Sequence, residues 1–268
     1  MTERDQYSPG VPCWIDTAQP DPSSALDFYG ALLGWEFAGP GAMPGDPPGE
    51  YYVARLRGRD VAGIGSQPPG LESSAGWMTH VAVESADRAA DRARDAGATV
   101  VAEPFDAPPA GRMAVLMDPA GAPFAVWQAE TRRGAQIVNE PSAWSMSNLS
   151  TTDPDGAKAF YGAMFGWEAE SFGPEVTLFR LPGYVGGEPA QPVPRDVVAV
   201  MTPGGEMSSW GVDLWVEDAD ATTAKASELG GTVHVEPRDI PGFRSAVIAD
   251  PHGAAMSISQ LMVPAAAR

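Results

Sequence analysis

Apolar side chains recur with a helical period in two stretches of the chain. In residues 25–33 they fall at i, i+3, i+4, i+7 and i+8, which places them on one face of a helix. The same spacing returns in residues 157–165. An Asp-Pro pair before each stretch and a glycine after it are the usual signals for the start and end of a helix. These signals are Asp21-Pro22 with Gly34, and Asp153-Pro154 with Gly166.

Short apolar segments bounded by glycine, proline and polar residues predict strands between and after these helices. A second, alanine-rich helix is predicted to end at Gly97, and its counterpart at Gly230. The order of elements in each half is therefore βαβββ, repeated twice. The expected strands are 11–18, 51–56, 61–66, 77–84, 99–103, 113–117 and 124–129, and then 144–150, 176–181, 197–202 and 210–217.

The chain is an internal duplication. Residues 25–36 return at 157–168 with an offset of 132 (160 − 28), and residues 118–122 return at 250–254 with the same offset. A near-constant offset across a whole module indicates two copies of one α+β module. We expect a flexible tail at 1–10, modules at 11–130 and 143–262, a linker at 131–142, and a tail at 263–268.

Composition narrows the class of protein. With 268 residues, 44% of them hydrophobic, and eight tryptophans, the chain can bury two cores. Its net charge of −18 argues against nucleic acid or an anionic membrane as a partner, and favours a cationic ligand or simple solubility. No apolar run approaches the roughly 20 residues of a membrane span. The single cysteine, Cys13, excludes an internal disulfide, so we expect a cytoplasmic protein.

Two motifs carry a resemblance to a known family. D-x-x-x-A-x-x-F-Y-x-x-x-x-G-W opens each module, and D-P-x-G-A occurs near its end. Together with the βαβββ order, they resemble the vicinal oxygen chelate superfamily, which includes glyoxalase I, bleomycin-resistance proteins and extradiol dioxygenases. The likeness is greatest to tandem glyoxalase-like proteins of actinobacteria. It covers residues 11–261 and is specific for fold more than for function. The resemblance implies that each module forms a cupped eight-stranded half-barrel. The Phe-Tyr pairs of the first motif are predicted to pack the helix on the sheet.

The resemblance also implies where a metal would bind. Catalytic members hold a divalent cation with three side chains of the cupped sheet, and only two of the six corresponding residues here, His80 and Asp213, can ligate. They belong to different modules. We therefore predict no metal and no cofactor, unless the modules share ligands or the strand registers differ by one. The six mapped positions are Trp14, His80 and Ala125 in the first module and Met146, Asp213 and Ser257 in the second.

Residues two apart on a strand face the same way, so each cup is predicted to present aromatic walls with a few polar groups. His80 with Asp16, or Asp213, are the candidates for acid–base catalysis, because histidine titrates near neutral pH and a carboxylate orients it. The alternatives are that the tryptophans are core, that His80 is a hydrogen-bonded core residue, and that the arginines form structural ion pairs. The predicted ligand-binding residues are Trp14, Trp77, Trp127, Trp144, Met146, Asn148, Trp215, Ser257, Arg112 and Arg244.

Three functions follow from this pattern. The first is a metal-independent protein that binds or sequesters an aromatic or cationic metabolite or antibiotic. The second is a metal-independent enzyme of secondary metabolism that uses His80 with Asp16 or Asp213. The third is a metal-dependent lyase, isomerase or dioxygenase. In each case the partner is a small organic molecule, and the chain acts as a monomer or a homodimer.

Overall fold

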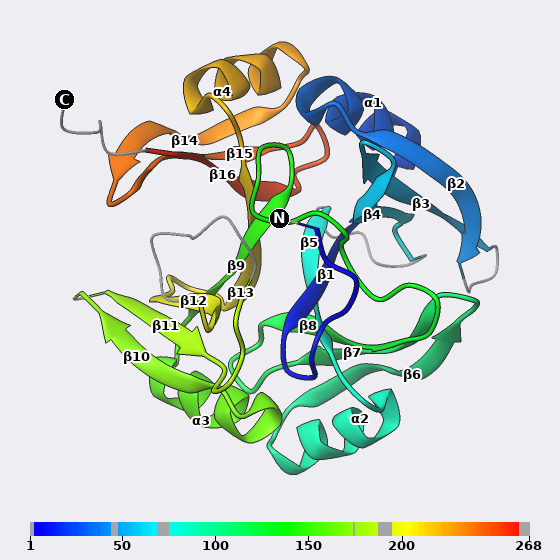
Figure 1. Ribbon diagram of the computed structural model, residues 1–268, viewed down its shortest axis with the longest axis vertical. Coiled ribbons are helices and arrows are strands. Elements are labelled where there is room, and N and C mark those ends of the chain that lie inside the picture. Colours follow the sequence, from blue (N-terminus) through cyan, green and yellow to red (C-terminus); the bar gives the residue numbers. More distant parts are fainter. Residues whose placement is uncertain (1–2, 44–47, 69–74, 174, 187–194, 263–268) are drawn as a thin grey trace. The chain divides into compact units, whose positions relative to one another are not determined.

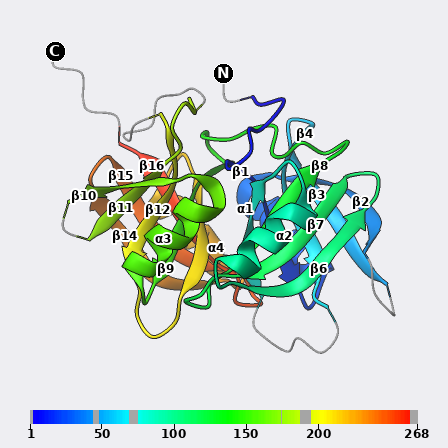
Figure 2. The same ribbon diagram turned by 90° about the horizontal axis from the view of Figure 1, so that it is seen from below.

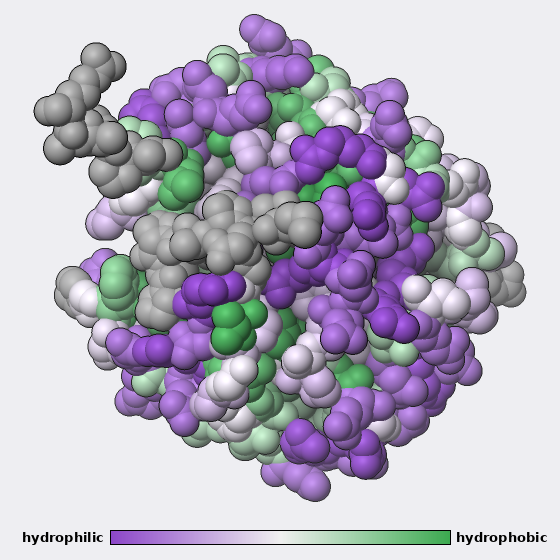
Figure 3. All heavy atoms as spheres, in the orientation of Figure 1, coloured by the Kyte–Doolittle hydropathy of each residue, from purple (hydrophilic) through white to green (hydrophobic). Residues whose placement is uncertain are grey.

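A computed structural model describes residues 3–43, 48–68, 75–173, 175–186 and 195–262. Each half of the chain forms one curled, eight-stranded sheet with two helices (Figure 1). None of the helices described is long and apolar enough to cross a membrane. The surface in Figure 3 is mostly hydrophilic, with small scattered apolar areas.

The first half follows the predicted order and forms a sheet with strand order β2-β3-β4-β1-β5-β8-β7-β6. The sequence had yielded no range for β2, the edge strand. The elements are β1 (Pro12–Gln19), α1 (Pro22–Leu33), β2 (Glu36–Met43), β3 (Gly49–Leu56), β4 (Arg59–Ser66), β5 (Gly76–Ala82), α2 (Ala86–Asp95), β6 (Thr99–Ala107), β7 (Gly111–Met117) and β8 (Pro123–Ala129).

The second half repeats this topology with strand order β10-β11-β12-β9-β13-β16-β15-β14. Here the sequence had yielded no range for the edge strand β10. The elements are β9 (Trp144–Thr151), α3 (Pro154–Phe165), β10 (Glu168–Phe172), β11 (Val176–Arg180), β12 (Val197–Pro203), β13 (Ser209–Trp215), α4 (Ala219–Glu228), β14 (Thr232–Ile240), β15 (Phe243–Ala249) and β16 (Ala255–Leu261).

The helix boundaries lie where the sequence placed them. Asp21 caps α1 by accepting hydrogen bonds from the backbone N–H groups of the next turn, and Gly34 ends it with φ 72°. Asp153 caps α3 in the same way, and Gly166 ends it with φ 73°. A side chain with a Cβ would be strained at either glycine.

The chain packs into two compact units that do not coincide with the two sequence modules. Unit 1 comprises Met1–Asp16, Met78–Gln136 and Met146–Val212, and unit 2 comprises Thr17–Trp77, Ile137–Ser145 and Asp213–Arg268. Each unit therefore combines one βαβββ repeat from each module. Helices α2 and α3 lie side by side in unit 1 (Figures 1 and 2), as α1 and α4 do in unit 2.

A buried tyrosine–aspartate hydrogen bond occurs in each unit and explains both sequence motifs. In unit 1, Tyr161 Oη donates to Asp118 Oδ2 at 2.9 Å, and Trp210 Nε1 donates to Tyr161 Oη at 2.8 Å. In unit 2, Tyr29 Oη donates to Asp250 Oδ2 at 2.9 Å. The tyrosine comes from one module and the aspartate from the other. The predicted packing role of the Phe-Tyr pairs is confirmed, since all four rings are at most 3% exposed.

The predicted tail at 1–10 makes specific contacts within unit 1. Tyr7 Oη donates to the backbone carbonyl of Ala135 at 2.7 Å, and Arg4 Nη1 donates to Tyr184 Oη at 2.6 Å. Burial raises the pKa of the Tyr7 phenol far above its usual range. The predicted tail at 263–268 lies outside the described residues, and the module boundaries themselves stay a prediction.

Candidate functional site

The strand pairing brings two of the mapped site positions opposite each other in each sheet. In the first sheet His80 on β5 is the direct partner of Ala125 on the parallel strand β8, and Trp127 follows two residues later on the same face. We call the face that carries Asp16, His80 and Trp127 the first inner face. In the second sheet Asp213 is the direct partner of Ser257. The pairing thus places two of the three mapped positions of each sheet directly beside each other.

His80 and Asp16 lie together on the first inner face. His80 Nε2 is 3.0 Å from Asp16 Oδ1, and the side chains are 2% and 19% exposed. The distance is that of a hydrogen bond, but the ring N–H is not aligned with the carboxylate. Among the described residues, none makes an aligned hydrogen bond with either ring nitrogen. The imidazole is thus buried with Nε2 as the nitrogen nearest the carboxylate.

Aromatic rings surround this pair. The ring of Trp127 meets His80 edge-on, with a centroid distance of 6.3 Å. Trp14 lies two residues before Asp16, so it shares the same face. Trp14 and Trp127 are 3% and 7% exposed, as the core interpretation of the tryptophans also predicts.

Arg132 is a residue of this site that sequence reasoning assigned only to the linker. Its guanidinium carbon lies 5.5 Å from the centroid of the Trp14 ring, within the range of a cation–π contact. Its backbone carbonyl accepts a hydrogen bond from Trp127 Nε1 at 2.8 Å. The linker therefore helps to form the site. Arg132 follows Trp127 by only five residues, and this proximity was the available signal.

Asp213, the equivalent of His80 in the second module, has different partners. Its Oδ2 accepts a hydrogen bond from Ser145 Oγ at 2.6 Å, and its Oδ1 accepts one from Ser259 Oγ at 2.7 Å. Burial raises the pKa of this carboxyl to about 6, although both serine hydrogen bonds act to lower it. Neither serine was among the predicted site residues. The sequence signal for Ser259 is its position, two residues after Ser257 on the same face.

The other aromatic and polar candidates divide between the two compact units. Met146 and Asn148 belong to unit 1 and are half-buried. Trp144 and Trp215 belong to unit 2 and are 5% and 4% exposed. Trp77 packs in the core of unit 2, where its ring meets Tyr29 edge-on at 5.5 Å. That these residues contact a ligand stays a prediction.

Arg112 and Arg244 are engaged in equivalent ion-pair clusters. Arg112 makes a bidentate pair with Asp87 at 2.9 Å and a second pair with Asp106 at 2.7 Å. Arg244 pairs with Asp220 and Asp239 in the same way. The hydrogen bonds with the aspartates raise the pKa of both guanidinium groups. Both arginines therefore form structural ion pairs, which was the alternative to a ligand contact in the sequence analysis.

The residues at the mapped metal positions do not suit a divalent cation. Such an ion needs three or more protein ligands, and Trp14 and Ala125 have no group that can bind it beside His80. Within the described ranges, no group of three or more His, Cys, Asp or Glu side chains is arranged to hold a metal. His80 and Asp16 supply only two ligands.

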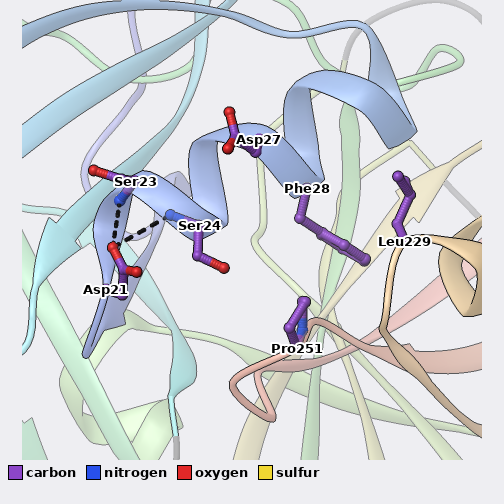
Figure 4. Close-up of a pocket in the computed structure, with 7 residues that line it drawn as sticks. All are labelled: Asp21, Ser23, Ser24, Asp27, Phe28, Leu229 and Pro251. Carbon is purple, nitrogen blue, oxygen red and sulfur yellow. Dashed lines mark hydrogen bonds between the residues drawn. The ribbon is translucent and has the colours of Figure 1, made fainter.

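A hollow of about 350 Å³ lies between α1 and the segments that contain Leu229 and Pro251 (Figure 4). Phe28 projects from α1 toward these two residues, and the Asp21 carboxylate at the helix start is bonded to the backbone N–H groups of Ser23 and Ser24. None of the predicted site residues lines this hollow.

Comparisons with known proteins agree with the two-module architecture. A family model described as a glyoxalase-like domain matches twice, at residues 14–127 and 146–259. The chain belongs to the glyoxalase-like domain family. "Putative glyoxylase CFP32" of Mycobacterium tuberculosis is 37% identical over 266 residues, covering 96% of this chain and 97% of that protein. "Anthracycline biosynthesis protein DnrV" of Streptomyces peucetius is 33% identical over 278 residues, covering 98% of each chain.

Solved structures of glyoxalase-like and dioxygenase proteins share the fold. The Mn(II)-bound glyoxalase from Novosphingobium aromaticivorans superposes with a TM-score of 0.63 at 17% identity, covering 94% of this chain and 82% of that one. The 2,3-dioxygenase LapB from Pseudomonas sp. KL28 superposes with a TM-score of 0.65 at 12% identity, covering 98% and 96%. Together with the glyoxalase-like family match and the curated relatives, these folds confirm the resemblance to the vicinal oxygen chelate superfamily. At these identities the likeness concerns the fold alone.

Proposed function

We propose that the first inner face binds a flat aromatic molecule and that His80 and Asp16 transfer protons on it. The observation that carries this proposal is the 3.0 Å approach of His80 Nε2 to Asp16 Oδ1 between tryptophan side chains. A carboxylate close to an imidazole favours transfer of a proton to the ring, because it stabilises the positive charge that develops there. The relative named for anthracycline biosynthesis supports a fused aromatic compound of secondary metabolism as the ligand.

The proposed chemistry is general acid–base catalysis. The imidazole accepts a proton from an acidic C–H or O–H group of the ligand, and Asp16 Oδ1 stabilises the imidazolium that results. The same imidazolium then returns the proton to another atom of the ligand, so no other reactant is consumed. Arg132, stacked on Trp14, supplies a positive charge near the aromatic wall, where it favours a ligand that develops negative charge on oxygen.

The reaction that we propose uses no resident metal. A tryptophan and an alanine occupy two of the three positions at which metal-dependent members of the superfamily are expected to place ligands. The side chains of Trp14 and Ala125 have no oxygen or imidazole nitrogen to offer a cation.

A second candidate function is binding without turnover, as in sequestration of an aromatic or cationic antibiotic. The observation that favours it is burial: His80 is only 2% exposed, so a ligand must displace neighbouring side chains to reach the imidazole. A protein that only sequesters its ligand needs the aromatic walls and not the histidine.

Two variants separate these candidates. His80→Gln and Asp16→Asn keep the shape and polarity of the side chains but remove the proton-transfer pair. With 1,8-dihydroxyanthraquinone and anthracycline aglycones as probes, we expect binding by tryptophan quenching in all proteins and conversion only in the wild type. His234→Gln, an exposed histidine on β14, is the matched control. Conversion that persists in His80→Gln rejects the acid–base proposal, and absence of both binding and conversion rejects the ligand class.

A further inference from the structure

A row of hydroxyl groups crosses one face of the second sheet within unit 2. Asp213 on β13 is the direct partner of Ser257 on β16, and Ser245 on β15 is the direct partner of Ser259 on β16. Residues 257 and 259 are two apart, so all four side chains share one face. The neighbouring positions Leu214, Ala246 and Ile258 are fully buried hydrophobic residues on the opposite face. We call the four-residue set Asp213, Ser245, Ser257 and Ser259 the serine face.

Hydrogen bonds hold the serine face in place. Ser259 Oγ is 2.7 Å from Asp213 Oδ1 and 3.2 Å from Ser245 Oγ, while Ser145 Oγ binds the other carboxyl oxygen at 2.6 Å. Asp213 and Ser259 are 8% and 5% exposed, whereas Ser245 and Ser257 are half-buried. Ser145 and Ser259 therefore anchor the carboxyl group, while Ser245 and Ser257 are the partly exposed residues of the same face.

Two aromatic rings lie on this face beside the hydroxyls. Trp215 follows Asp213 by two residues and Phe243 precedes Ser245 by two, so both continue the face. Their ring centroids are 6.0 Å apart with an interplanar angle of 50°. Phe243 is half-buried, so part of its ring is accessible.

We propose that the serine face binds a polyhydroxylated, sugar-like molecule. A serine hydroxyl both donates and accepts, so Ser245 and Ser257 can satisfy ring hydroxyls of either polarity. The C–H face of a sugar ring packs on Phe243 and Trp215. A purely aromatic ligand fits poorly, because it would cover hydroxyl groups without replacing their hydrogen bonds to water. This site does not depend on the proposed function of His80.

Saturation-transfer NMR with methyl β-D-glucopyranoside and D-glucosamine tests the proposal, with phenol as the aromatic comparison compound. We expect millimolar binding of at least one sugar. Asp213→Asn should weaken it about tenfold, and Ser257→Ala, which copies Ala125 of the first module, about threefold. Ser227→Ala, a serine of α4, should leave it unchanged. If Asp213→Asn fails to fold, as judged by circular dichroism, Ser257→Ala carries the test.

Two results would overturn the sugar site: no transfer to either sugar at tens of millimolar, or transfer that is equal in wild type and Ser257→Ala. Sugar binding should also survive in His80→Gln. Loss of aromatic conversion in that variant with sugar binding intact would show that the two sites are independent. If phenol binds and the sugars do not, the serine face is an aromatic site and the proposal is wrong.

Discussion

The two modules share their anchoring contacts and differ in the side chains at corresponding inner-face positions. The tyrosine–aspartate bonds and the arginine clusters occur in both copies with nearly identical distances. In contrast, His80, Ala125 and Trp127 of the first sheet correspond to Asp213, Ser257 and Ser259 of the second. One face is aromatic with a histidine, and the other is a row of hydroxyls with a carboxyl. The duplicated scaffold has thus been retained while the surface that can meet a ligand has diverged.

The largest expected effect concerns the first inner face. If His80 and Asp16 transfer protons, then His80→Gln and Asp16→Asn should each lower kcat/KM by about 10²–10⁴-fold, the usual contribution of a general acid–base group. Steady-state kinetics with the aromatic substrate identified in the anthraquinone screen measures this loss. A loss of less than about threefold in either variant would mean that the asymmetry between the modules does not reflect catalysis at His80.

The two tyrosine–aspartate hydrogen bonds are expected to contribute unequally to stability despite their similar geometry. Tyr161→Phe removes a hydroxyl that both donates to Asp118 and accepts from Trp210, and should lower the free energy of unfolding by about 3 kcal/mol. Tyr29→Phe should cost about half as much, because Gln19 Nε2 still donates to Asp250 Oδ2 at 2.7 Å. Urea unfolding of both variants makes the comparison. Equal losses would show that Gln19 does not compensate.

The Asp213 carboxyl should make the stability of the protein depend on pH. Its pKa is raised from 3.8 to about 6 in the folded protein. Between these two pH values the protein therefore takes up a proton when it folds. The stabilisation by the protonated Asp213 carboxyl is fully present below the pKa of the unfolded chain and is lost as the pH rises through 6. The difference in unfolding free energy between wild type and Asp213→Asn should fall by about 2 kcal/mol from pH 4.5 to 7.5.

Urea unfolding across this pH range, for both proteins, gives the measurement. The wild type carries many other carboxylates, and their contributions cancel in the difference between the two proteins. A pH-independent difference would indicate that the two serine hydrogen bonds offset the burial of the carboxylate.

The smallest effect is expected at the arginine clusters. Arg112→Ala and Arg244→Ala should each leave the urea midpoint of unfolding nearly unchanged, because their aspartate partners are exposed to solvent and screened by salt. Any shift of the midpoint should shrink in molar salt. If either variant instead reduces ligand binding with its stability intact, the arginine contacts the ligand, as the sequence first suggested.

Local chemistry made most of the fold predictable. The helix boundaries follow from capping residues and glycines, whereas the pairings His80–Ala125 and Asp213–Ser257 come from the structure. Of the five strands for which the sequence gives no range, β14, β15 and β16 repeat β6, β7 and β8, whereas β2 and β10 are edge strands that are mostly or fully exposed. An exposed edge strand has no buried side, so its sequence shows no alternation of apolar and polar residues from which to predict it.

The sequence by itself determined the duplication, the βαβββ order, the helix boundaries and which residue types occupy the mapped metal positions, because each of these depends on neighbours along the chain. The tertiary structure decided that Tyr161 bonds Asp118, that Arg132 stacks on Trp14, that His80 meets Asp16, and that Ser145 and Ser259 hold Asp213. These contacts join segments far apart in the sequence. Their geometry arises only when strands pair and repeats from different modules pack together, so no local pattern could specify them.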